Sequence, residues 1–419
     1  MDQHVIRNEL AHWLAPSLYK RCGSALRSCW AGWILCAALC VACDSTSHAP
    51  LHHQMYIWQR AWKPEVRKAM AELGPSVSGW HVLVTESDAL GRWAVFVPEL
   101  SAPRGSGLGM TAVVRIDGSR LLADSGWLAA RVKGWLDSQP AGRWSGLEID
   151  YDCPNRQLPV YARFLQSLRT VLPSGMTLSV TALPAWIGES SLHDVLKLTD
   201  RSVLQVHSVL DPHRGLFDPT LAAKWIAAYS KVSPRPFEVA LPDYGSRVSW
   251  DDRGRLVAVT SEGPENWLPG SVELDSDPRQ VAAFVALLAQ SHPGNLAGFV
   301  WFRLPLESDR RIWSIQTLAS VIGGQPLIPG FAVSVERDGQ GAYHLVLNNT
   351  GTVDTDLPQI VHVDGSCQAA DGSGLYTVSH EGGELVFERR QVRKLRVGQR
   401  AGVGWTHCEL GREDVHLED

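Results

Sequence analysis

The stretch that decides the fold reads Gly146-Leu147-Glu148-Ile149-Asp150-Tyr151-Asp152-Cys153-Pro154. Apolar and acidic residues alternate in it, which is the period of a β-strand whose two faces meet different surroundings. Leu147, Ile149 and Tyr151 therefore point to one face. The side chains of Glu148, Asp150 and Asp152 point to the other, spaced about 6.5–7 Å along the strand. We predict a strand over 146–152 with three carboxylates on its buried face.

Three carboxylates on one buried face indicate chemistry, because like charges in a low dielectric raise one another's pKa. A protein tolerates this mainly for proton transfer or cation binding, and one member then holds a proton near neutral pH, as a general acid must. By residue type we assign Asp152 as the general acid. Asp150 orients it or stabilises developing positive charge, and Glu148 is a deeper supporting carboxylate. The alternative is a salt-bridged core network with Arg115 as counter-charge.

Strand-like and helix-like segments alternate on both sides of this stretch. The predicted strands are Met55–Trp62, Trp80–Thr85, Arg92–Val97, Met110–Ile116, Gly146–Asp152, Thr177–Ala182, Val203–Val209, Phe237–Leu241 and Ala297–Phe302. The predicted helices are Pro64–Glu72, Leu121–Asp137, Pro159–Leu172, Pro219–Val232, Pro278–Gln290 and Ile312–Ile322, and Arg247–Val259 is a probable hairpin. About eight strand–helix units fit an α/β fold, a (β/α)8 TIM barrel over residues 54–325. A doubly wound sheet alternates similarly, but no Gly-rich phosphate loop follows the first strand.

The pattern changes after Gly323-Gly324-Gln325-Pro326. Short apolar runs separated by Gly, Asn and Asp follow, which are typical of an all-β domain. We predict a small β-sandwich-like domain over residues 330–419. Cys367 and Cys408 both fall in it and could form a disulfide in an oxidising compartment, whereas Cys153 is expected to be a buried thiol.

Composition excludes several classes of function. The chain has 419 residues, a formal net charge of −5 and a sequence pI of about 6.3, so we expect no nucleic-acid partner. No His, Cys or Asp cluster has a recognisable zinc spacing, and we expect neither a metal nor a cofactor. The 17 Trp outnumber the 9 Phe and the 8 Tyr. Trp residues at strand ends could stack on sugar rings, whereas those in helices pack against the barrel.

The N-terminus reads as an export signal. A basic start is followed by an uncharged run from Ser28 to Ala42, which has the length of a secretory apolar region and is too short to span a bilayer comfortably. Leu39-Cys40-Val41-Ala42-Cys43 resembles a bacterial lipobox, in which Cys43 is lipidated and becomes the first mature residue. We therefore expect a signal peptide over 1–42, a tether over 43–53 and a lipid anchor on the periplasmic face of a bacterial membrane. The alternative is an ordinary signal peptide with an incidental cysteine.

The segment Ser145–Pro154 resembles the family-18 glycoside hydrolase (chitinase-like) signature Asp-Gly-x-Asp-x-Asp-x-Glu. Val180–Ala185, Ala240–Gly245 followed by Arg247, and Gly298–Trp301 are similar to that family's fifth-, seventh- and eighth-strand segments. The first signature Asp is Ser145 here, and Asp152 stands in place of the acid Glu. A closer whole-chain match is an uncharacterised bacterial family, domain of unknown function 3142, which shares Asp-x-Asp-Cys-Pro and Ala-Leu-Pro-x-Trp.

The resemblance implies a barrel that binds sugars at the C-terminal ends of its strands, with Trp301 as the floor of a subsite. His207 stands where the chitinase family usually has a Tyr next to an Asp, and it faces the same side of its strand as Gln205. A lone His is more often a core or subsite residue than a catalytic one. The expected substrate-binding residues are Trp58, Trp186, Gln205, His207, Asp243, Tyr244, Trp301 and Arg303.

Three functions remain open from the sequence. The first is a lipoprotein that hydrolyses glycosidic bonds of a polysaccharide or glycoconjugate, with Asp152 as acid. The second is a catalytically impaired, lectin-like barrel that binds glycans, because Asp has replaced the acid Glu. The third is a structural envelope lipoprotein whose β domain recruits a partner.

Overall fold

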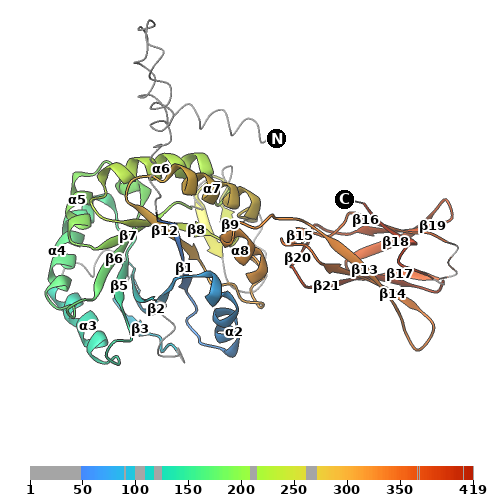
Figure 1. Cartoon of the computed structure of the whole chain (residues 1–419), viewed down its shortest axis with the longest axis horizontal. Helices are drawn as coiled ribbons and strands as arrows, with labels where there is room; N and C mark the ends of the chain where they lie inside the picture. The colour runs from blue at the N-terminus through green and yellow to red at the C-terminus, as the bar shows by residue number, and fades with distance from the viewer. Residues whose placement is uncertain are drawn as a thin grey trace, which may run out of the picture. The chain divides into compact units, whose positions relative to one another are not determined.

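Eight parallel strands close into a barrel in the computed structural model (Figure 1). The structure describes residues 49–88, 91–99, 109–117, 125–207, 215–260, 271–365, 367, 369–408 and 410–418. Around the barrel the strands are β1 (His52–Ile57), β2 (Gly79–Ser87), β4 (Gly109–Ile116), β5 (Gly146–Asp150), β6 (Thr177–Ala182), β7 (Arg201–Gln205), β8 (Phe237–Pro242) and β12 (Leu296–Phe302). Because β1 pairs in parallel with both β2 and β12, the sheet is closed. The predicted TIM barrel is confirmed.

Alternation along each strand divides the side chains between two cores. Residues such as Ile57, Val114 and Ile149 face outward and are fully buried beneath the helices. Leu83 and Val300 belong to a second cluster in the interior of the barrel. A strand buried on both faces reads as a continuous apolar run, as β12 does. The candidate functional side chains are therefore the few polar residues that occupy inward positions of these otherwise apolar strands.

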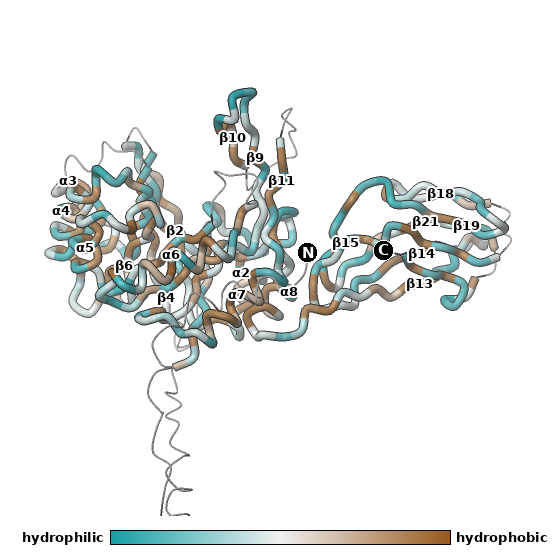
Figure 2. The backbone as a smooth tube through the Cα atoms, turned by 90° about the horizontal axis from the view of Figure 1, so that it is seen from above, coloured by the Kyte–Doolittle hydropathy of each residue, from teal (hydrophilic) through white to brown (hydrophobic). Residues whose placement is uncertain are grey.

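Seven helices surround the barrel in the part of the chain that the structure describes. They are α2 (Pro64–Leu73), α3 (Ser125–Asp137), α4 (Leu158–Arg169), α5 (Ser190–Lys197), α6 (Pro219–Val232), α7 (Pro278–Ser291) and α8 (Ile315–Ile322). Side chains of Asp218, Asp277 and Ser314 accept hydrogen bonds from the first turns of α6, α7 and α8, which fixes where these helices begin. Figure 2 shows the apolar character of α7 and α8, which pack against each other.

The helix count differs from the expected eight units at two places. The connection from β2 to β4 contains the short antiparallel strand β3 (Trp93–Val95) and no helix among its described residues. α5 was not predicted, since Ser190–Lys197 is short and half polar. The described residues also contain three single turns of 3₁₀ helix, at Gly74–Ser76, Asn155–Gln157 and Pro184–Trp186.

A three-stranded antiparallel sheet lies between β8 and α7 in the sequence. It consists of β9 (Ser246–Trp250), β10 (Leu256–Thr260) and β11 (Ser271–Leu274), with β9 in the middle. The β9–β10 hairpin is the predicted one, whereas β11 was not predicted. One face of β9 packs with Tyr244 against Leu274 and Ile312, so the sheet extends the barrel wall at the end of β8.

The C-terminal domain is all-β, as predicted. One sheet has the order β13 (Phe331–Arg337), β14 (Tyr343–Asn349), β21 (Arg400–Thr406) and β17 (Ala370–Gly372). The other has the order β18 (Tyr376–Glu381), β19 (Glu384–Arg389), β16 (Ile360–Val363) and β22 (Val415–Glu418), and β15 (Thr355–Asp356) pairs with β20 (Lys394–Leu395). Leu345, Val361, Phe387 and Val403 from both sheets share one core. The expected disulfide joins Cys367 and Cys408.

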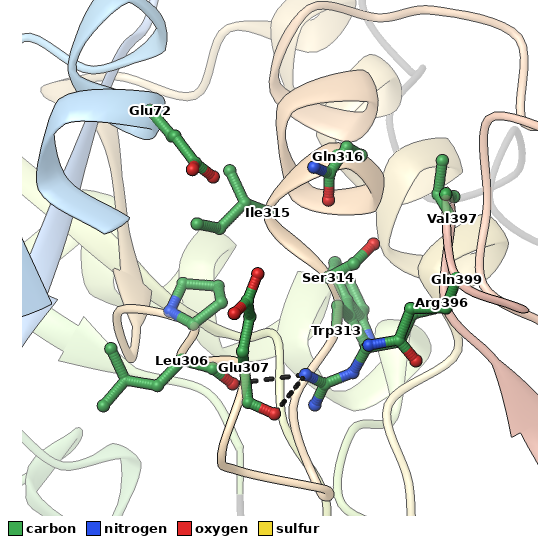
Figure 3. A pocket seen from close by; sticks show the side chains of 12 residues that line it. Glu72, Leu306, Glu307, Trp313, Ser314, Ile315, Gln316, Arg396, Val397 and Gln399 are labelled. Atoms are coloured by element: carbon green, nitrogen blue, oxygen red, sulfur yellow. Dashed lines mark hydrogen bonds between the residues drawn. The ribbon is translucent and has the colours of Figure 1, made fainter. Parts of the chain in front are cut away.

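Two side chains of the β domain, Arg396 and Asp354, are bound to the barrel, and Figure 3 shows Arg396. Arg396 donates hydrogen bonds to the carbonyl oxygens of Leu306 (3.2 Å) and Ile312 (3.0 Å), in the loop between β12 and α8. Asp354 accepts from the backbone N–H and the hydroxyl of Ser314, at 2.6 Å each. Because Ser314 also caps α8, the β domain completes the N-terminus of a barrel helix. A pocket lined in part by these residues lies at this junction.

The expected export segment, including Cys43, lies outside the described residues. β1 begins at His52 rather than at 54, because His52 and His53 pair in parallel with Gly298 and Phe299 of β12. Among the described residues, no helix is both long enough and apolar enough to cross a membrane.

Candidate active site

The three carboxylates of the signature strand form a row from the barrel interior to its mouth. Glu148 is fully buried, Asp150 is 6% exposed, and the side chain of Asp152 is 47% exposed. β5 ends at Asp150, so Asp152 stands on the loop above the strand rather than in it. The row therefore runs from a carboxylate with no access to solvent to one that a ligand can reach.

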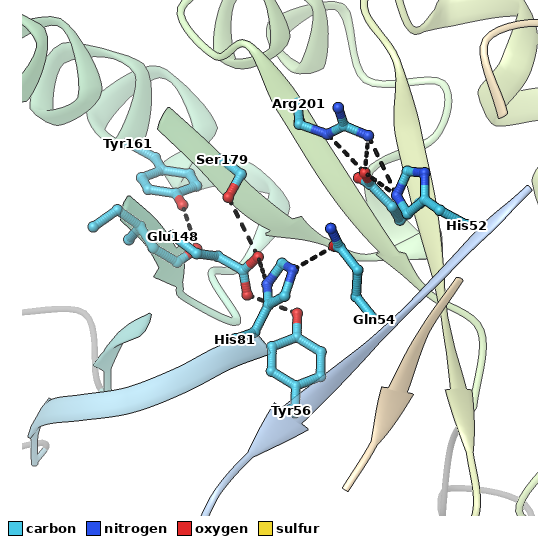
Figure 4. A network of polar contacts seen from close by, with 10 residues as sticks. His52, Gln54, Tyr56, His81, Glu148, Tyr161, Ser179 and Arg201 are labelled. Atoms are coloured by element: carbon cyan, nitrogen blue, oxygen red, sulfur yellow. Dashed lines mark hydrogen bonds and ion pairs between the residues drawn. The ribbon is translucent and has the colours of Figure 1, made fainter. Parts of the chain in front are cut away.

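Glu148 is held by a network of donors at the centre of the barrel (Figure 4). The hydroxyl of Tyr56 donates to Oε1 at 2.6 Å. Nδ1 of His81 lies 2.9 Å from Oε2, and the hydroxyl of Ser179 lies 3.3 Å from it. The other ring nitrogen of His81 is 2.7 Å from Oε1 of Gln54. Both carboxylate oxygens are thus engaged, and Glu148 lies deepest in the row, as expected.

Sequence reasoning missed the partners of Glu148. His81 and Tyr56 alternate with apolar residues on β2 and β1, so each is a polar residue on an inner face. A polar residue at an inward position of an otherwise apolar strand is the signal in the sequence that could have identified His81 and Tyr56. Which carboxylate they meet depends on the closure of the barrel, which brings β1 and β2 opposite β5.

Arg115 is the counter-charge of the two upper carboxylates. The β4–β5 register places Arg115 opposite Asp150, and its guanidinium donates to Asp150 at 2.7 Å. It also lies 3.8 Å from Asp152 and 3.4 Å from Asp117. The salt-bridged network considered as the alternative is therefore present in part. It coexists with an open mouth, because the Arg115 side chain is 29% exposed.

Burial raises the pKa of Asp150 to about 6, against the opposing charge of Arg115, and the negative charges of Asp152 and Glu148 raise it further. Burial also raises the pKa of Asp152, and Arg115 again opposes the shift. Like charges that share one site titrate as a set, so the two Asp residues are a coupled pair. The pair holds a proton at a pH where isolated carboxyls are ionised.

Aromatic rings surround this row at the mouth, and Phe302 lies at their centre. Its ring centroid is 5.1 Å from that of Trp58, 5.5 Å from Tyr244 and 5.7 Å from Tyr56. The guanidinium of Arg115 lies 5.9 Å from the centre of the Trp58 ring. Trp58 and Tyr244, both predicted as substrate-binding residues, belong to this aromatic cluster but are only 8% and 6% exposed, whereas Phe302, which was not predicted, is half-buried.

His207 and Gln205 face the mouth from the end of β7, as their spacing predicts. His207 is 8% exposed, and its ring lies edge-on to Tyr244 at 5.8 Å. Burial lowers the pKa of His207 to about 4, so its imidazole is neutral near pH 7. Its Nδ1 atom is buried without a hydrogen-bond partner. Gln205 is half-buried on the same face of the chain.

The predictions that Trp301 and Trp186 contact a sugar are wrong. Both are fully buried. Trp301 points outward from β12 into the layer beneath the helices, where its indole N–H donates to Nδ1 of His53 at 3.1 Å. Trp186 turns back into the same layer, and its N–H donates to the carbonyl oxygen of Cys153 at 2.9 Å. Neither indole presents a face to the mouth.

Asp243 and Arg303 are also buried too deeply to contact a ligand in the mouth. They are 0% and 2% exposed, and Arg303 forms an ion pair with Asp309. Burial raises the pKa of Asp243 well above its usual range, against the opposing charge of Arg303. Asp243 and Arg303 directly follow the ends of β8 and β12.

Neither a metal centre nor a nucleophilic thiol emerges from the described residues. No group of three or more His, Cys, Asp or Glu side chains among them could hold a metal ion. Cys153 is buried, and burial raises the pKa of its thiol to about 12. A thiol with so high a pKa is a poor nucleophile at neutral pH.

Two protein families match segments of this chain. Residues 106–307 match the family described as domain of unknown function DUF3142. This segment is a DUF3142 domain. Residues 332–409 match a second domain of unknown function, DUF8456, which corresponds to the β domain. No curated protein matches the chain.

Solved structures with a similar fold are chitinases and spore cortex-lytic enzymes. SleL of Bacillus megaterium is 12% identical with a TM-score of 0.49, and the match covers 66% of this chain and 74% of that enzyme. A chitinase of Chromobacterium violaceum is 14% identical with a TM-score of 0.46, covering 65% and 98%. Chitinase ChiA74 of Bacillus thuringiensis is 9% identical with a TM-score of 0.44, covering 88% and 98%. The barrel fold of this chain is established by the pairing of its own strands, not by these matches.

Proposed function

We propose that the DUF3142 barrel of this chain hydrolyses glycosidic bonds of a polysaccharide or glycoconjugate. The observation that carries the proposal is the row of Glu148, Asp150 and Asp152, which ends in an accessible carboxyl beside a ring of aromatic side chains. Glycoside hydrolysis needs a carboxylic acid that keeps its proton near neutral pH and a second carboxylate close to the sugar. The raised pKa values of the Asp pair supply the first requirement.

Asp152 donates its proton to the leaving oxygen, because it is the carboxyl of the row that a ligand can reach. Asp150, once ionised, stabilises the positive charge that develops on the sugar. Glu148 and its donors hold the base of the row in place. Phe302, which is half-buried and packs against Trp58 and Tyr244, offers apolar surface to the sugar ring. In the resembling chitinase family the 2-acetamido group of the substrate is the nucleophile, and an N-acetylated sugar fits this arrangement.

Arg115 favours a second function, glycan binding without turnover. Its guanidinium lies 3.8 Å from Asp152 and 2.7 Å from Asp150, and a nearby cation favours the ionised form of a carboxyl. An acid that is ionised before the substrate arrives cannot protonate the leaving oxygen. The balance between burial and Arg115 therefore decides between an enzyme and a lectin-like barrel.

The decisive experiment compares the full chain, in detergent, with its Asp152→Asn variant on chitooligosaccharides, peptidoglycan and bacterial exopolysaccharides. We expect turnover by the wild type and a loss of about 100-fold or more in kcat for the variant, because general acids contribute that much. Asp137→Asn is the matched control, since it removes an equal charge from an exposed ion pair with Lys133 on α3 and leaves the row and Arg115 untouched. Turnover that survives Asp152→Asn rules out the acid role, and binding without turnover establishes the second function.

We propose in addition that the chain is exported and anchored by a lipid on Cys43. The support is the lipobox-like segment Leu39–Cys43 after an uncharged run. Cys43→Ser should abolish incorporation of a labelled fatty acid in a bacterial host, and Cys40→Ser is the matched control. Equal labelling of both variants contradicts the assignment.

A further inference from the structure

The three-stranded sheet that follows β8 has one polar and one apolar face. On the polar face, Arg247 of β9 forms an ion pair with Glu273 of β11. The register defines the other face, because residues directly opposite each other in an antiparallel pair point to the same side, and side chains alternate along each strand. Apart from Ser246 beside the barrel, that face consists of Val248 and Trp250 of β9, Leu256 and Val259 of β10, and Val272 and Leu274 of β11. We call these six residues the apolar sheet face.

The apolar sheet face is covered near the barrel and exposed farther away. Val248 is fully buried, because it packs in one hydrophobic cluster with Tyr244 at the end of β8. Val259 and Val272, which pair with Val248 from either side, are 43% and 46% exposed. Leu256, next to the tip of the β9–β10 hairpin, is 41% exposed. The outer part of the face therefore presents apolar surface to solvent.

Exposed apolar side chains are concentrated on this sheet. Among the described residues eleven large apolar side chains are exposed, and four of them lie on β10 and β11. They are Leu256, Val257, Val259 and Val272. Single exposed apolar residues are ordinary on a protein surface, whereas several that share one face mark a binding surface.

The apolar sheet face is joined to the mouth of the barrel by contiguous side chains. Val248 and Tyr244 belong to one hydrophobic cluster, and Trp250 and Phe302 pack against it from either end. Phe302 and Trp250 are both partly exposed. Because Phe302 is the aromatic residue that we assign to the sugar ring, a ligand bound at the mouth can extend from it onto the sheet.

Branched aliphatic side chains determine which ligand fits the exposed part of this face. Leu256, Val259 and Val272 present methyl groups, not the flat aromatic rings on which sugar rings stack. Val and Leu side chains form no hydrogen bonds, which sugar hydroxyls need when they leave water. These side chains instead complement a hydrocarbon chain. A ligand that fits both the mouth and the sheet therefore has a sugar and an attached apolar chain.

A lipid bilayer is a less suitable occupant of the apolar sheet face. A segment that enters a bilayer needs apolar residues where it first meets the hydrocarbon, whereas the tip of the β9–β10 hairpin reads Asp251-Asp252-Arg253-Gly254-Arg255. Figure 2 shows that this hairpin projects from the barrel and that its tip is hydrophilic. The charged tip would have to enter the hydrocarbon before Val259 and Val272 reached it, which is costly.

We propose that the apolar sheet face binds the hydrocarbon portion of an amphiphilic glycoconjugate whose sugar occupies the mouth of the barrel. The inference rests on the proposed glycan-binding role of the mouth, and it names the substrate class as sugars linked to an apolar chain. Binding of the chain removes its own surface and that of Val259 and Val272 from water, which is the source of the selectivity.

The test compares methyl and octyl glycosides of one chitooligosaccharide by calorimetry, with the full chain held in lipid nanodiscs so that no detergent competes for the sheet. We expect the octyl glycoside to bind at least tenfold more tightly, because each buried methylene group favours binding. Val259→Ser combined with Val272→Ser should remove most of this preference. The methyl glycoside does not reach the sheet, so its affinity should be unchanged in the double variant.

Two controls accompany the comparison. Val232→Ser makes the same chemical change at a Val of α6 that is 38% exposed, and it should leave both affinities unchanged. Empty nanodiscs measure the partition of the octyl glycoside into lipid, which is the same for every variant.

Each outcome separates this inference from the proposed function. Equal affinities for the two glycosides, or a preference for the octyl glycoside that survives the double variant, overturn the inference and leave hydrolysis at the mouth unaffected. A preference that the double variant removes, without any turnover, supports the inference and contradicts hydrolysis. No binding of either glycoside at millimolar concentration overturns both. A dimer in sedimentation that the double variant dissociates identifies the apolar sheet face as a self-association surface instead.

Discussion

Arg115 and Asp150 stand opposite each other on neighbouring parallel strands, and the guanidinium donates to the carboxylate across 2.7 Å. Burial raises the pKa of Asp150, whereas Arg115 lowers it, and the result is a pKa of about 6. Without the cation, the buried carboxyl would keep its proton to a higher pH. Without the burial, it would be ionised throughout the physiological range. These two opposing effects set the pKa of Asp150. A small change in either effect therefore changes the ionised fraction of Asp150 and, with it, the charge at the mouth of the barrel.

Asp150→Asn should stabilise the fold as the pH rises. The ordinary pKa of Asp is 3.8 and the folded value is about 6, so the folded state binds this proton more tightly than the unfolded chain. The stability that this tighter proton binding gives the folded state is fully present below pH 3.8 and is lost as the pH rises through 6. Asn does not ionise, so the free energy of unfolding of the variant relative to wild type should increase by up to about 3 kcal/mol between pH 4 and pH 7. Urea denaturation at each pH measures this, and a difference that is constant with pH contradicts it.

Arg115→Met should raise the pKa of Asp150 above 6, because it removes the charge that opposes burial. The acidic limb of any pH–rate profile should move to higher pH by about one unit, the typical effect of one nearby charge. Arg115→Lys keeps the charge and is the matched control. Carboxyl carbon chemical shifts of labelled Asp report the same shift without any substrate. Equal titration in the Met and Lys variants shows that Arg115 does not set it.

His81→Leu should destabilise the protein by about 3 kcal/mol, because it leaves the fully buried Glu148 without one of its partners. The double variant His81→Leu with Glu148→Leu should lose less stability than the sum of the two single variants, since both sides of their mutual contact become apolar. Denaturation of the two single variants and the double variant completes the cycle. Additive losses indicate that His81 and Glu148 do not interact.

The polar faces of the barrel were predictable from the sequence, whereas its apolar faces were not. Alternation in Gly146–Asp152 assigned Glu148 and Asp150 to the interior, and the same spacing placed Gln205 and His207 on one side of β7. β12 carries no such marker, because Leu296–Phe302 is buried on both faces and reads as one apolar run. The resemblance to the chitinase family assigned Trp301 to the mouth, whereas in the structure Trp301 points outward and Phe302 inward.

Contacts between distant strands were equally hidden. Tyr56 and His81 meet Glu148 only because the barrel closes, with 92 and 67 residues between them in sequence. Trp186 shows the opposite failure, since a strand-end position suggested an open loop. Pro184–Trp186 instead forms a 3₁₀ turn that directs the indole into the core. Local pattern assigns a face to a residue, but tertiary packing decides whether that face is open.

We therefore expect Trp301 to contribute to stability and Phe302 to contribute to glycan binding. Substituting each residue by Ala in turn distinguishes these two roles. Trp301→Ala should cost about 3–5 kcal/mol of stability, because it empties a large site in the outer core. The glycan affinity of the protein that remains folded should be unchanged. Phe302→Ala should weaken glycan binding about tenfold, since aromatic contacts contribute up to about 1.5 kcal/mol, with a smaller loss of stability because the ring is only half-buried. Thermal unfolding and calorimetry with a chitooligosaccharide measure both quantities. A loss of affinity in Trp301→Ala without a loss in Phe302→Ala restores Trp301 as the floor of the subsite and contradicts the arrangement of the mouth described above.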